Sequence, residues 1–213
     1  MITLDIITGT KSNKETRSVQ LPSVWEDITL QQFMLLLSLK TWDEVSLLHI
    51  LTGLSKEFIL NVPEKSLRDV SKYLFFITEV PDFRTWAKPK HVTIAGKEYK
   101  VPTVRAHTFG QKIYLQQEVN RVIENKHNQN EAAPYALAVY FYPIVTGDKE
   151  YTEEKILEFI PTVMQMRATD AIPTADFFLR SYLKSLKKKE RHSLLNLLKN
   201  KRTQELNHLT STE

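Results

Sequence analysis

Apolar residues recur at helical spacing in the segment LPSVWEDITLQQFMLLLSL, which runs from Leu21 to Leu39. This stripe predicts an amphipathic helix that begins near Leu30 and packs its apolar face against another element. Its members are Leu30, Phe33, Met34, Leu37 and, at one edge, Leu36. Trp25 precedes the helix, and we expect it to act with Phe33 as a structural anchor for this part of the chain.

Capping boxes mark three expected helix starts. In a capping box, the N-cap side chain accepts a hydrogen bond from the backbone of the third helical residue, whose own side chain bonds back to the cap. The pairs are Thr29 with Gln32, Thr41 with Glu44, and Thr108 with Gln111. Gly53 follows the second of these helices and suits the left-handed conformation that ends many helices.

Two more helices are predicted before residue 80. Ser55 begins a short helical turn, and Pro63 stands at the first position of a longer helix that runs to about Thr78. Tyr73, Phe75 and Phe76 are expected to widen the buried face of that helix. Together with the two preceding helices, these segments predict a compact helical unit.

The second half of the chain is also predicted to be helical. Ala133–Val145 is apolar on nearly all sides, which predicts the central buried helix of a C-terminal layer. Thr152 caps the next helix, which Pro161 is expected to kink or split. A last helix is expected to start at Thr174, because Pro173 interrupts the pattern just before it.

Alternation of apolar and polar residues predicts two β-hairpins. At the N-terminus, strands over Ile2–Ile6 and Thr16–Leu21 flank a polar loop over Gly9–Glu15. The central hairpin has strands over His91–Ile94 and Lys97–Val101 around an Ala-Gly turn. Because an isolated hairpin is barely stable in water, we expect the strands of the two hairpins to pair with each other.

These elements predict a mainly α fold with small β-hairpins, an α+β arrangement of helical bundle layers with an N-terminal and a central hairpin. We expect an N-terminal unit over residues 1–86, a second unit over 87–183, and a basic, leucine-containing C-terminal helix over 184–213. The first two units can also be read as one domain, since 213 residues suffice for a sizeable core. The loop-like segment Val80–Pro89 is expected to be a hinge between them.

No residue pattern in the chain indicates a particular chemistry. Cysteine is absent, which excludes disulfides and thiolate ligands, and no phosphate-binding, dinucleotide-binding or zinc-protease motif occurs. The six histidines lack ligand spacing, and Glu153, Glu154 and Glu158 are explained by the first turns of a helix. We therefore expect no catalytic residue, no metal and no cofactor. The chain also lacks a long apolar run and a signal-like start, so we expect a soluble protein without a membrane contact.

Basic residues concentrate near the C-terminal end, whereas the rest of the chain carries an acidic excess. A predicted helix there could bind nucleic-acid phosphates or an acidic partner surface. The residues concerned are Lys184, Lys187, Lys188, Lys189 and Arg191. They can equally form a solvated face whose lysine stems cover leucines, and aromatic residues for base stacking are missing from the run. The leucines beyond Leu194 offer an amphipathic docking stripe for a protein partner.

Several segments together resemble a group of tailed-bacteriophage morphogenesis and virion proteins, across about Leu21 to Leu183. The segments are LPSVWEDITLQQF, LLHILTGLS, HVTIAGKEYKVP, HTFGQKIYL, ALAVYFYPIV, YTEEKILEFI and ADFFLRSYL. The resemblance is to head-to-tail connector or ring proteins, or to tail assembly chaperones, of crAss-like and other phages of Bacteroidetes hosts. Its motifs concern packing and capping, so it transfers no catalytic residue, and it does not include the basic C-terminal segment.

The resemblance implies a non-enzymatic structural subunit of the phage neck or tail. Such a subunit would be assembled in the host cytoplasm, stay in the virion, form a homo-oligomeric ring, and bind other phage structural proteins. DNA contact through the basic C-terminal helix is a further expectation for a ring near the DNA exit path. The alternative that it implies is a cytoplasmic tail or baseplate assembly chaperone that is absent from the mature virion.

Overall fold

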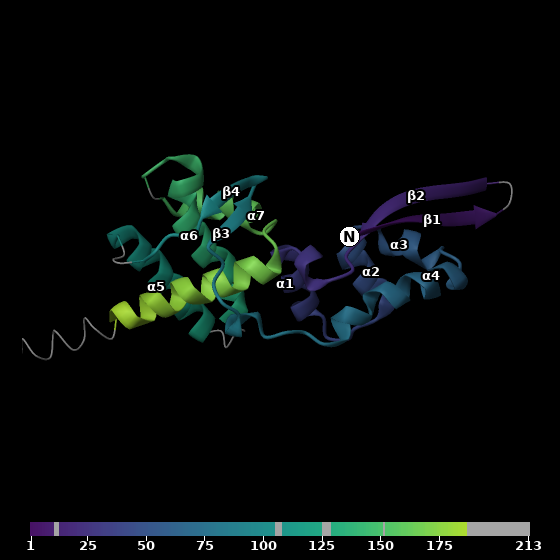
Figure 1. Ribbon diagram of the computed structural model, residues 1–213, viewed down its shortest axis with the longest axis horizontal. Helices are drawn as coiled ribbons and strands as arrows, with labels where there is room; N and C mark the ends of the chain where they lie inside the picture. The colour runs from purple at the N-terminus through teal and green to yellow at the C-terminus, as the bar shows by residue number, and fades with distance from the viewer. Residues whose placement is uncertain (11–12, 105–107, 125–128, 151, 187–213) are drawn as a thin grey trace, which may run out of the picture.

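The structure is a computed structural model, and it describes residues 1–10, 13–104, 108–124, 129–150 and 152–186. The described part of the chain is mainly helical with two small two-stranded antiparallel sheets, which confirms the predicted fold class. Figure 1 shows an elongated molecule with the N-terminal hairpin at one end and the final helix at the other. A single cluster of buried apolar residues runs through both halves.

The N-terminal half consists of a long β-ribbon and a series of short helices. The strands are β1 (Ile2–Thr10) and β2 (Asn13–Leu21), and the α-helices are α1 (Leu30–Ser38), α2 (Glu44–Thr52), α3 (Lys56–Leu60) and α4 (Glu64–Ser71). Short 3₁₀ helices lie at η1 (Trp25–Asp27), η2 (Lys72–Thr78) and η3 (Phe83–Thr85). The predicted helix starts after Thr29 and Ser55 are confirmed, since each side chain accepts a hydrogen bond from the first turn.

The N-terminal hairpin is longer than the alternation pattern indicated. A polar loop over Gly9–Glu15 was expected, but Gly9 pairs with Lys14 and Thr10 with Asn13, so the ladder continues almost to the tip. A strand ladder is built from backbone groups, and apolar alternation is needed only where one face packs on a core. The prediction of this loop is therefore wrong.

Two details of the N-terminal helices also differ from the prediction. Asp43, not Thr41, is the N-cap of α2, because its carboxylate accepts a hydrogen bond of 2.8 Å from the amide of Ser46. The predicted end of α2 is confirmed, since Gly53 adopts a left-handed conformation with a φ of 72°. Aspartate caps a helix as well as threonine does, so sequence spacing alone could not separate the two candidates.

The predicted helix from Pro63 to Thr78 divides into α4 and the 3₁₀ helix η2. Pro63 is the N-cap, not the first helical residue. In a 3₁₀ helix residues three apart lie on the same side, so η2 buries Leu74 and Ile77. Phe76 is half-buried against the core, as predicted, whereas Tyr73 is 43% exposed. Phe75 is 77% exposed, and the prediction that it widens the buried face is wrong.

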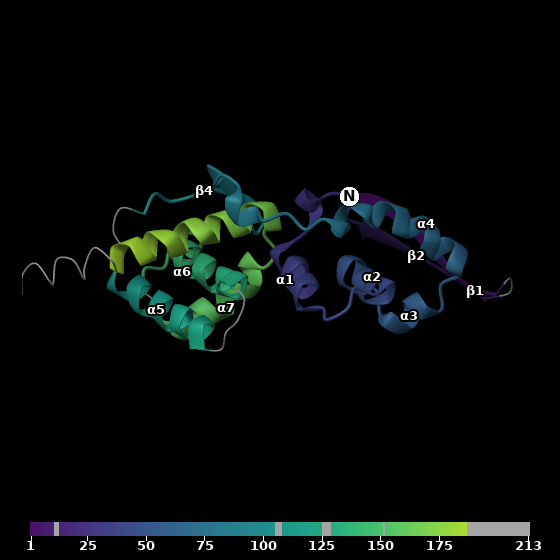
Figure 2. The same ribbon diagram turned by 90° about the horizontal axis from the view of Figure 1, so that it is seen from below.

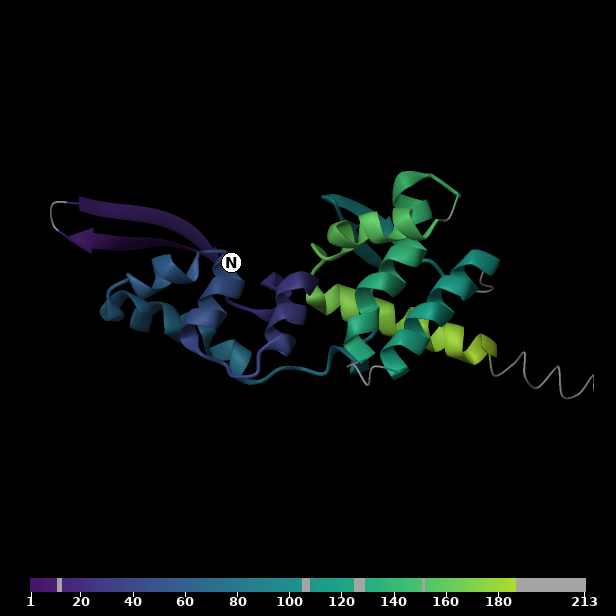
Figure 3. The same ribbon diagram turned by 180° about the vertical axis from the view of Figure 1, so that it is seen from behind.

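The C-terminal half is built around a buried helix. Its elements are β3 (His91–Ile94), β4 (Lys97–Lys100), α5 (Phe109–Glu124), η4 (Gln129–Ala132), α6 (Ala133–Thr146), α7 (Glu153–Val163) and a final helix over residues 168–186. Every residue of α6 from Ala133 to Tyr142 is buried, which confirms the predicted central helix. The final helix crosses α6, where the rings of Tyr140 and Phe178 stack at 3.9 Å (Figure 3).

The β3–β4 hairpin forms as predicted but does not pair with the N-terminal hairpin. Ala95 and Gly96 both have positive φ, 49° and 75°, as the tightest two-residue hairpin turn requires. The two hairpins form separate two-stranded sheets, so the expected pairing is wrong. The central hairpin instead buries Val92 and Ile94 in the apolar core, so this packing supplies the stability expected from a third strand.

Proline does not interrupt the C-terminal helices as predicted. Pro161 lies inside α7 without splitting it, near the end of the helix. The missing amide deprives only the carbonyl of Leu157, a residue that is 49% exposed. The final helix begins at residue 168, not at Thr174, so Pro173 lies in its second turn. The predicted split at Pro161 is therefore wrong, a kink there stays a prediction, and the predicted start at Thr174 is wrong.

Candidate interaction surfaces

Two helix starts bind each other where the halves of the molecule meet. The amides of Leu30 and Gln31, the first two residues of α1, donate to the carbonyls of Met166 (2.7 Å) and Met164 (2.9 Å). In return the amide of Ala168, at the start of the final helix, donates a hydrogen bond of 2.8 Å to the carbonyl of Ile28. Amides in a first turn have no partner within their own helix, so each half satisfies donors of the other. Figure 2 shows α1 at this junction.

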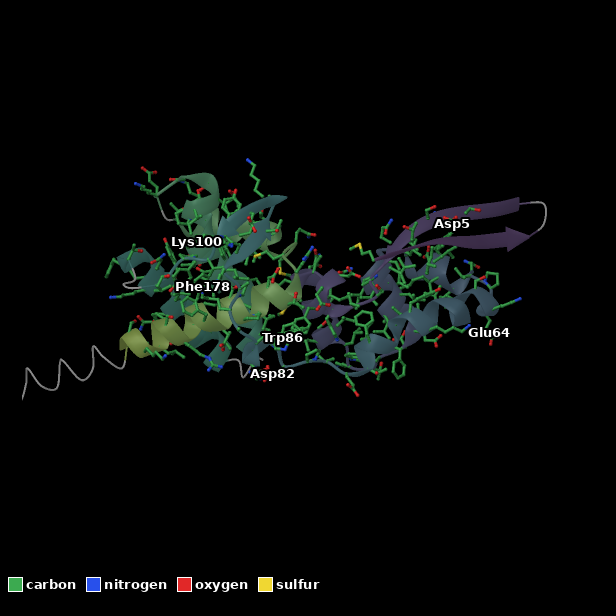
Figure 4. The ribbon with its side chains drawn as sticks, viewed as in Figure 1. Asp5, Glu64, Asp82, Trp86, Lys100 and Phe178 are labelled. Atoms are coloured by element: carbon green, nitrogen blue, oxygen red, sulfur yellow. The ribbon has the colours of Figure 1, made fainter. Side chains whose placement is uncertain are left out.

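Aromatic rings support the junction from the N-terminal side. Trp25 is buried and meets Phe33, Phe76 and Phe83 edge-on, with ring centroids 5.4–6.3 Å apart. Its indole N–H donates to the carbonyl of Glu79 at 3.2 Å. These contacts attach the chain ahead of α1 to the segment that links the halves, where Trp86 and Asp82 are labelled in Figure 4.

The capping box of α1 has a second function that the sequence did not reveal. The Thr29 hydroxyl accepts a hydrogen bond from the backbone amide of Gln32, and the side-chain oxygen Oε1 of Gln32 accepts one from the backbone amide of Thr29 at 2.9 Å. The amide nitrogen of the Gln32 side chain also donates to the carbonyl of Leu51, at 3.1 Å, near the end of α2. The cap therefore ties α1 to α2. The matching box of α5 is present at the exposed Thr108, with bonds of 3.0 and 3.2 Å to Gln111.

The base of the β1–β2 ribbon packs against the body of the molecule. Near the body, Ile6, Val19 and Leu21 are buried against the helices, and the guanidinium of Arg17 lies 4.4 Å from the centre of the Phe58 ring. The opposite face carries polar cross-strand pairs, in which Ser18 bonds to Asp5 and Gln20 to Thr3. Toward its tip, the ribbon extends past α3 and α4 (Figures 1 and 2). Its outer part is thus a projecting arm.

A groove of about 450 Å³ lies between α5, η4 and the final helix. Most of its lining is apolar and comes from segments far apart in the sequence. The apolar residues that the final helix contributes are Ile172, Ala175, Leu179 and Leu183. Val119 and Val122 of α5 face them. No sequence pattern indicated this groove, and Leu183 in its lining is 44% exposed.

One rim of the groove carries two Asp–Arg ion pairs. Arg84 and Asp82 approach to 2.8 Å, and Arg180 and Asp176 approach to 2.6 Å. The hydrogen bonds from Arg84 lower the pKa of Asp82, and the pKa of the Arg84 guanidinium is raised in turn. The rim is therefore balanced in charge, because each aspartate has a cation beside it.

The carboxylate of Asp148 closes the turn after α6. The hydroxyl of Tyr142 donates to Asp148 at 2.7 Å, and the Lys155 ammonium approaches the same carboxylate to 2.8 Å. The hydrogen bonds from Lys155, from the Glu150 amide and from Tyr142 lower the pKa of Asp148 to about 2. This arrangement joins the end of α6 to the first turn of α7.

The basic candidates lie at the edge of the described structure. Lys184 is exposed near the end of the final helix. The others, Lys187, Lys188, Lys189 and Arg191, lie outside the described residues, so their common face stays a prediction.

Known proteins offer no comparison for these surfaces. Comparison with protein-family models, with curated proteins and with solved structures found no match. Among the residues that the structure describes, no three His, Asp or Glu side chains are grouped so that they could hold a metal ion. Over the same residues, no helix combines the length and the apolar character needed to cross a bilayer.

Proposed function

We propose that this chain is a non-enzymatic structural subunit of a tailed phage particle, located in a neck or tail ring, and that it binds neighbouring virion proteins. The sequence resemblance described above suggests the particle. The observation that carries the proposal is the projecting β1–β2 ribbon, because a subunit that binds neighbours needs surfaces beyond its own core. The ring itself and the identity of its neighbours rest on the resemblance.

The outer edge of β1 has the properties of a strand-addition site. No backbone hydrogen bond from a segment other than β2 reaches its described residues. Proteins usually protect such an edge with lysine, proline or a bulge. Between Ile2 and Thr10 there is no lysine or proline, Asp5 is the one charged residue, and the register with β2 runs without a bulge. An extended segment of a neighbouring protein could therefore add to β1 through main-chain hydrogen bonds.

Mass spectrometry of purified virions tests the proposed location. We expect peptides of this chain at a stoichiometry comparable to that of other neck or tail proteins. If the chain is abundant in infected cells but missing from the particles, it is an assembly chaperone and the proposed function is wrong. Sizing the isolated protein by light scattering complements this test, since a ring subunit is expected to form a closed oligomer at high concentration.

A shortened ribbon tests the role of the arm. Residues 7–16 are replaced by Asn-Gly, which joins Ile6 to Arg17, two residues that pair directly across the ladder. The variant keeps Ile6, Arg17, Val19 and Leu21, which pack on the body, so we expect the far-ultraviolet spectrum and the melting temperature to change little. We expect incorporation into particles to fall at least tenfold when the variant complements a deletion phage.

The matched control is Gln20→Ala, which removes an outer-face hydrogen bond but keeps the full length of the ribbon. It should enter particles at the level of the natural protein. Equal incorporation of the shortened variant and the control would show that the arm is not used in assembly.

A further inference from the structure

The apolar groove between α5 and the final helix lies close to the point where the described chain stops. Leu183 lines the groove, and the last described residue, 186, follows it within one helical turn. Residues 187–213 lie outside the described part of the chain. Their sequence begins with the polar run KKKERHS and continues with LLNLL, which places four leucines among the five residues from Leu194 to Leu198.

We infer that the leucines of residues 194–198 bind in this groove of the same chain and cover it in the free protein. The first argument is chemical. Four leucines so close together favour removal from water, and the groove presents side chains of the same kind from α5 and the final helix. The polar residues 187–193 can remain in solvent as the connection between them.

The second argument is one of length. Seven connecting residues span up to about 23 Å when extended. The lining residues of the final helix, from Ile172 to Leu183, cover about 16 Å along the helix axis. The connection is therefore long enough to turn back from residue 186 and bring Leu194 to any part of the groove.

The third argument concerns competing occupants. The rim beside the groove carries the Asp82–Arg84 and Asp176–Arg180 pairs, so its charges balance and do not select a strongly acidic or basic partner. A segment attached by a short linker has an effective concentration of about millimolar order, well above that of a second copy in dilute solution. The leucine segment of the same chain is thus favoured as the occupant over a strongly charged partner and over a second copy.

The absence of cysteine from the natural sequence allows a direct test. Leu179→Cys places one thiol in the groove of the full chain, and its rate of reaction with a maleimide reports access. We expect this rate to rise at least tenfold when Leu194, Leu195, Leu197 and Leu198 are all replaced by serine. Equal rates in the two backgrounds would overturn the inference. Leu183→Cys is a second reporter in the same groove should Leu179→Cys fold poorly.

A matched control reports general reactivity. Leu157→Cys lies on α7, is 49% exposed and does not line the groove, so its rate should be the same in both backgrounds. A second measurement distinguishes the same chain from a neighbour. With Leu179→Cys and Leu195→Cys together, a short bismaleimide should give a cross-linked product with the mass of one chain, whereas a product of two chains only would contradict the inference. Neither result depends on whether the protein is found in virions.

Discussion

The α-helices of the N-terminal half have 5 to 9 residues, whereas α5, α6 and α7 of the C-terminal half have 16, 14 and 11. Helices as short as α1 to α4 are not stable alone, so they depend on side-chain caps and on contacts with neighbours. Thr29, Asp43 and Ser55 supply such caps. In the C-terminal half, the helices are stabilised mainly by packing around α6, which is almost completely buried. The comparison shows two ways of stabilising helices within one chain.

The junction makes the two halves depend on each other. Each helix start there satisfies its amides with carbonyls of the opposite half, as Leu30 with Met166 and Ala168 with Ile28 show. If the halves separated, these donors would need water or another partner. The proposed hinge over Val80–Pro89 is therefore not the sole connection between them, and the predicted boundary at residue 86 stays a prediction.

The largest effect is expected from Phe178→Ala, which attacks the packing of the C-terminal half. Phe178 is fully buried, stacks on Tyr140 and meets Phe141 at 5.8 Å. Removing a buried ring leaves a cavity, and we expect the free energy of unfolding to fall by about 3–5 kcal/mol. Urea unfolding followed by far-ultraviolet circular dichroism measures the change.

Tryptophan fluorescence sharpens this experiment. Trp25, Trp42 and Trp86 all lie before β3, so their signal reports the N-terminal half and the linking segment. If the junction couples the halves, Phe178→Ala should shift the fluorescence transition together with the dichroism transition. The control is Phe109→Ala, a ring that is 79% exposed, which should change stability by no more than about 0.5 kcal/mol. If Phe178→Ala leaves the midpoint of the fluorescence transition unchanged, the two halves unfold independently.

A smaller effect is expected from substitutions in the two capping boxes. The same local motif occurs in two different surroundings, so the two substitutions can be compared. Thr29 is half-buried at the junction, and Thr108 is exposed at the start of α5. We expect Thr29→Ala to lower the free energy of unfolding by about 1–2 kcal/mol and Thr108→Ala by about 0.5–1 kcal/mol. Chemical denaturation of both variants measures the difference. Thr29→Ser keeps the hydroxyl and should recover most of the loss, and equal losses at both sites would remove the distinction between the halves.

Local signals made much of the fold predictable from the sequence. The caps at Thr29, Thr108 and Thr152 and the left-handed Gly53 each require only neighbouring residues, and all are present. The Ala-Gly turn of the central hairpin is of the same kind. The apolar run of α6 was also sufficient, because a helix without a polar face has to be buried.

Features decided by distant contacts were not predictable in this way. The start of the final helix depends on the carbonyl of Ile28, which lies 140 residues before Ala168 and accepts its amide. No local pattern near Pro173 contains that information. The groove combines residues of α5, η4 and the final helix, so its shape exists only after folding. The second bond of Gln32, to the carbonyl of Leu51, likewise depends on the packing of α1 against α2.

The smallest expected effect concerns pH and belongs to the charged turn between α6 and α7. Asp148 has a pKa of about 2 in the folded protein against an ordinary value of 3.8. A carboxyl whose pKa is lowered by folding stabilises the protein fully above its unfolded pKa, and the contribution disappears as pH falls through the folded pKa. The difference in melting temperature between the natural protein and Asp148→Asn should therefore be constant above about pH 5 and decline between about pH 4 and pH 2.

Lys155→Met shows whether the hydrogen bond from the ammonium sets this window. Removing the largest cause of the shift should raise the pKa of Asp148 toward 3.8, so the contribution of the carboxylate would vanish at a higher pH. Melting curves at intervals of half a pH unit on the single and double variants measure the displacement. A difference between Asp148→Asn and the natural protein that stays unchanged down to pH 2 would mean that the carboxylate does not stabilise this turn through its charge. The ion pair would then be incidental, and the C-terminal end of α6 would be held by apolar packing, as the rest of the helix is.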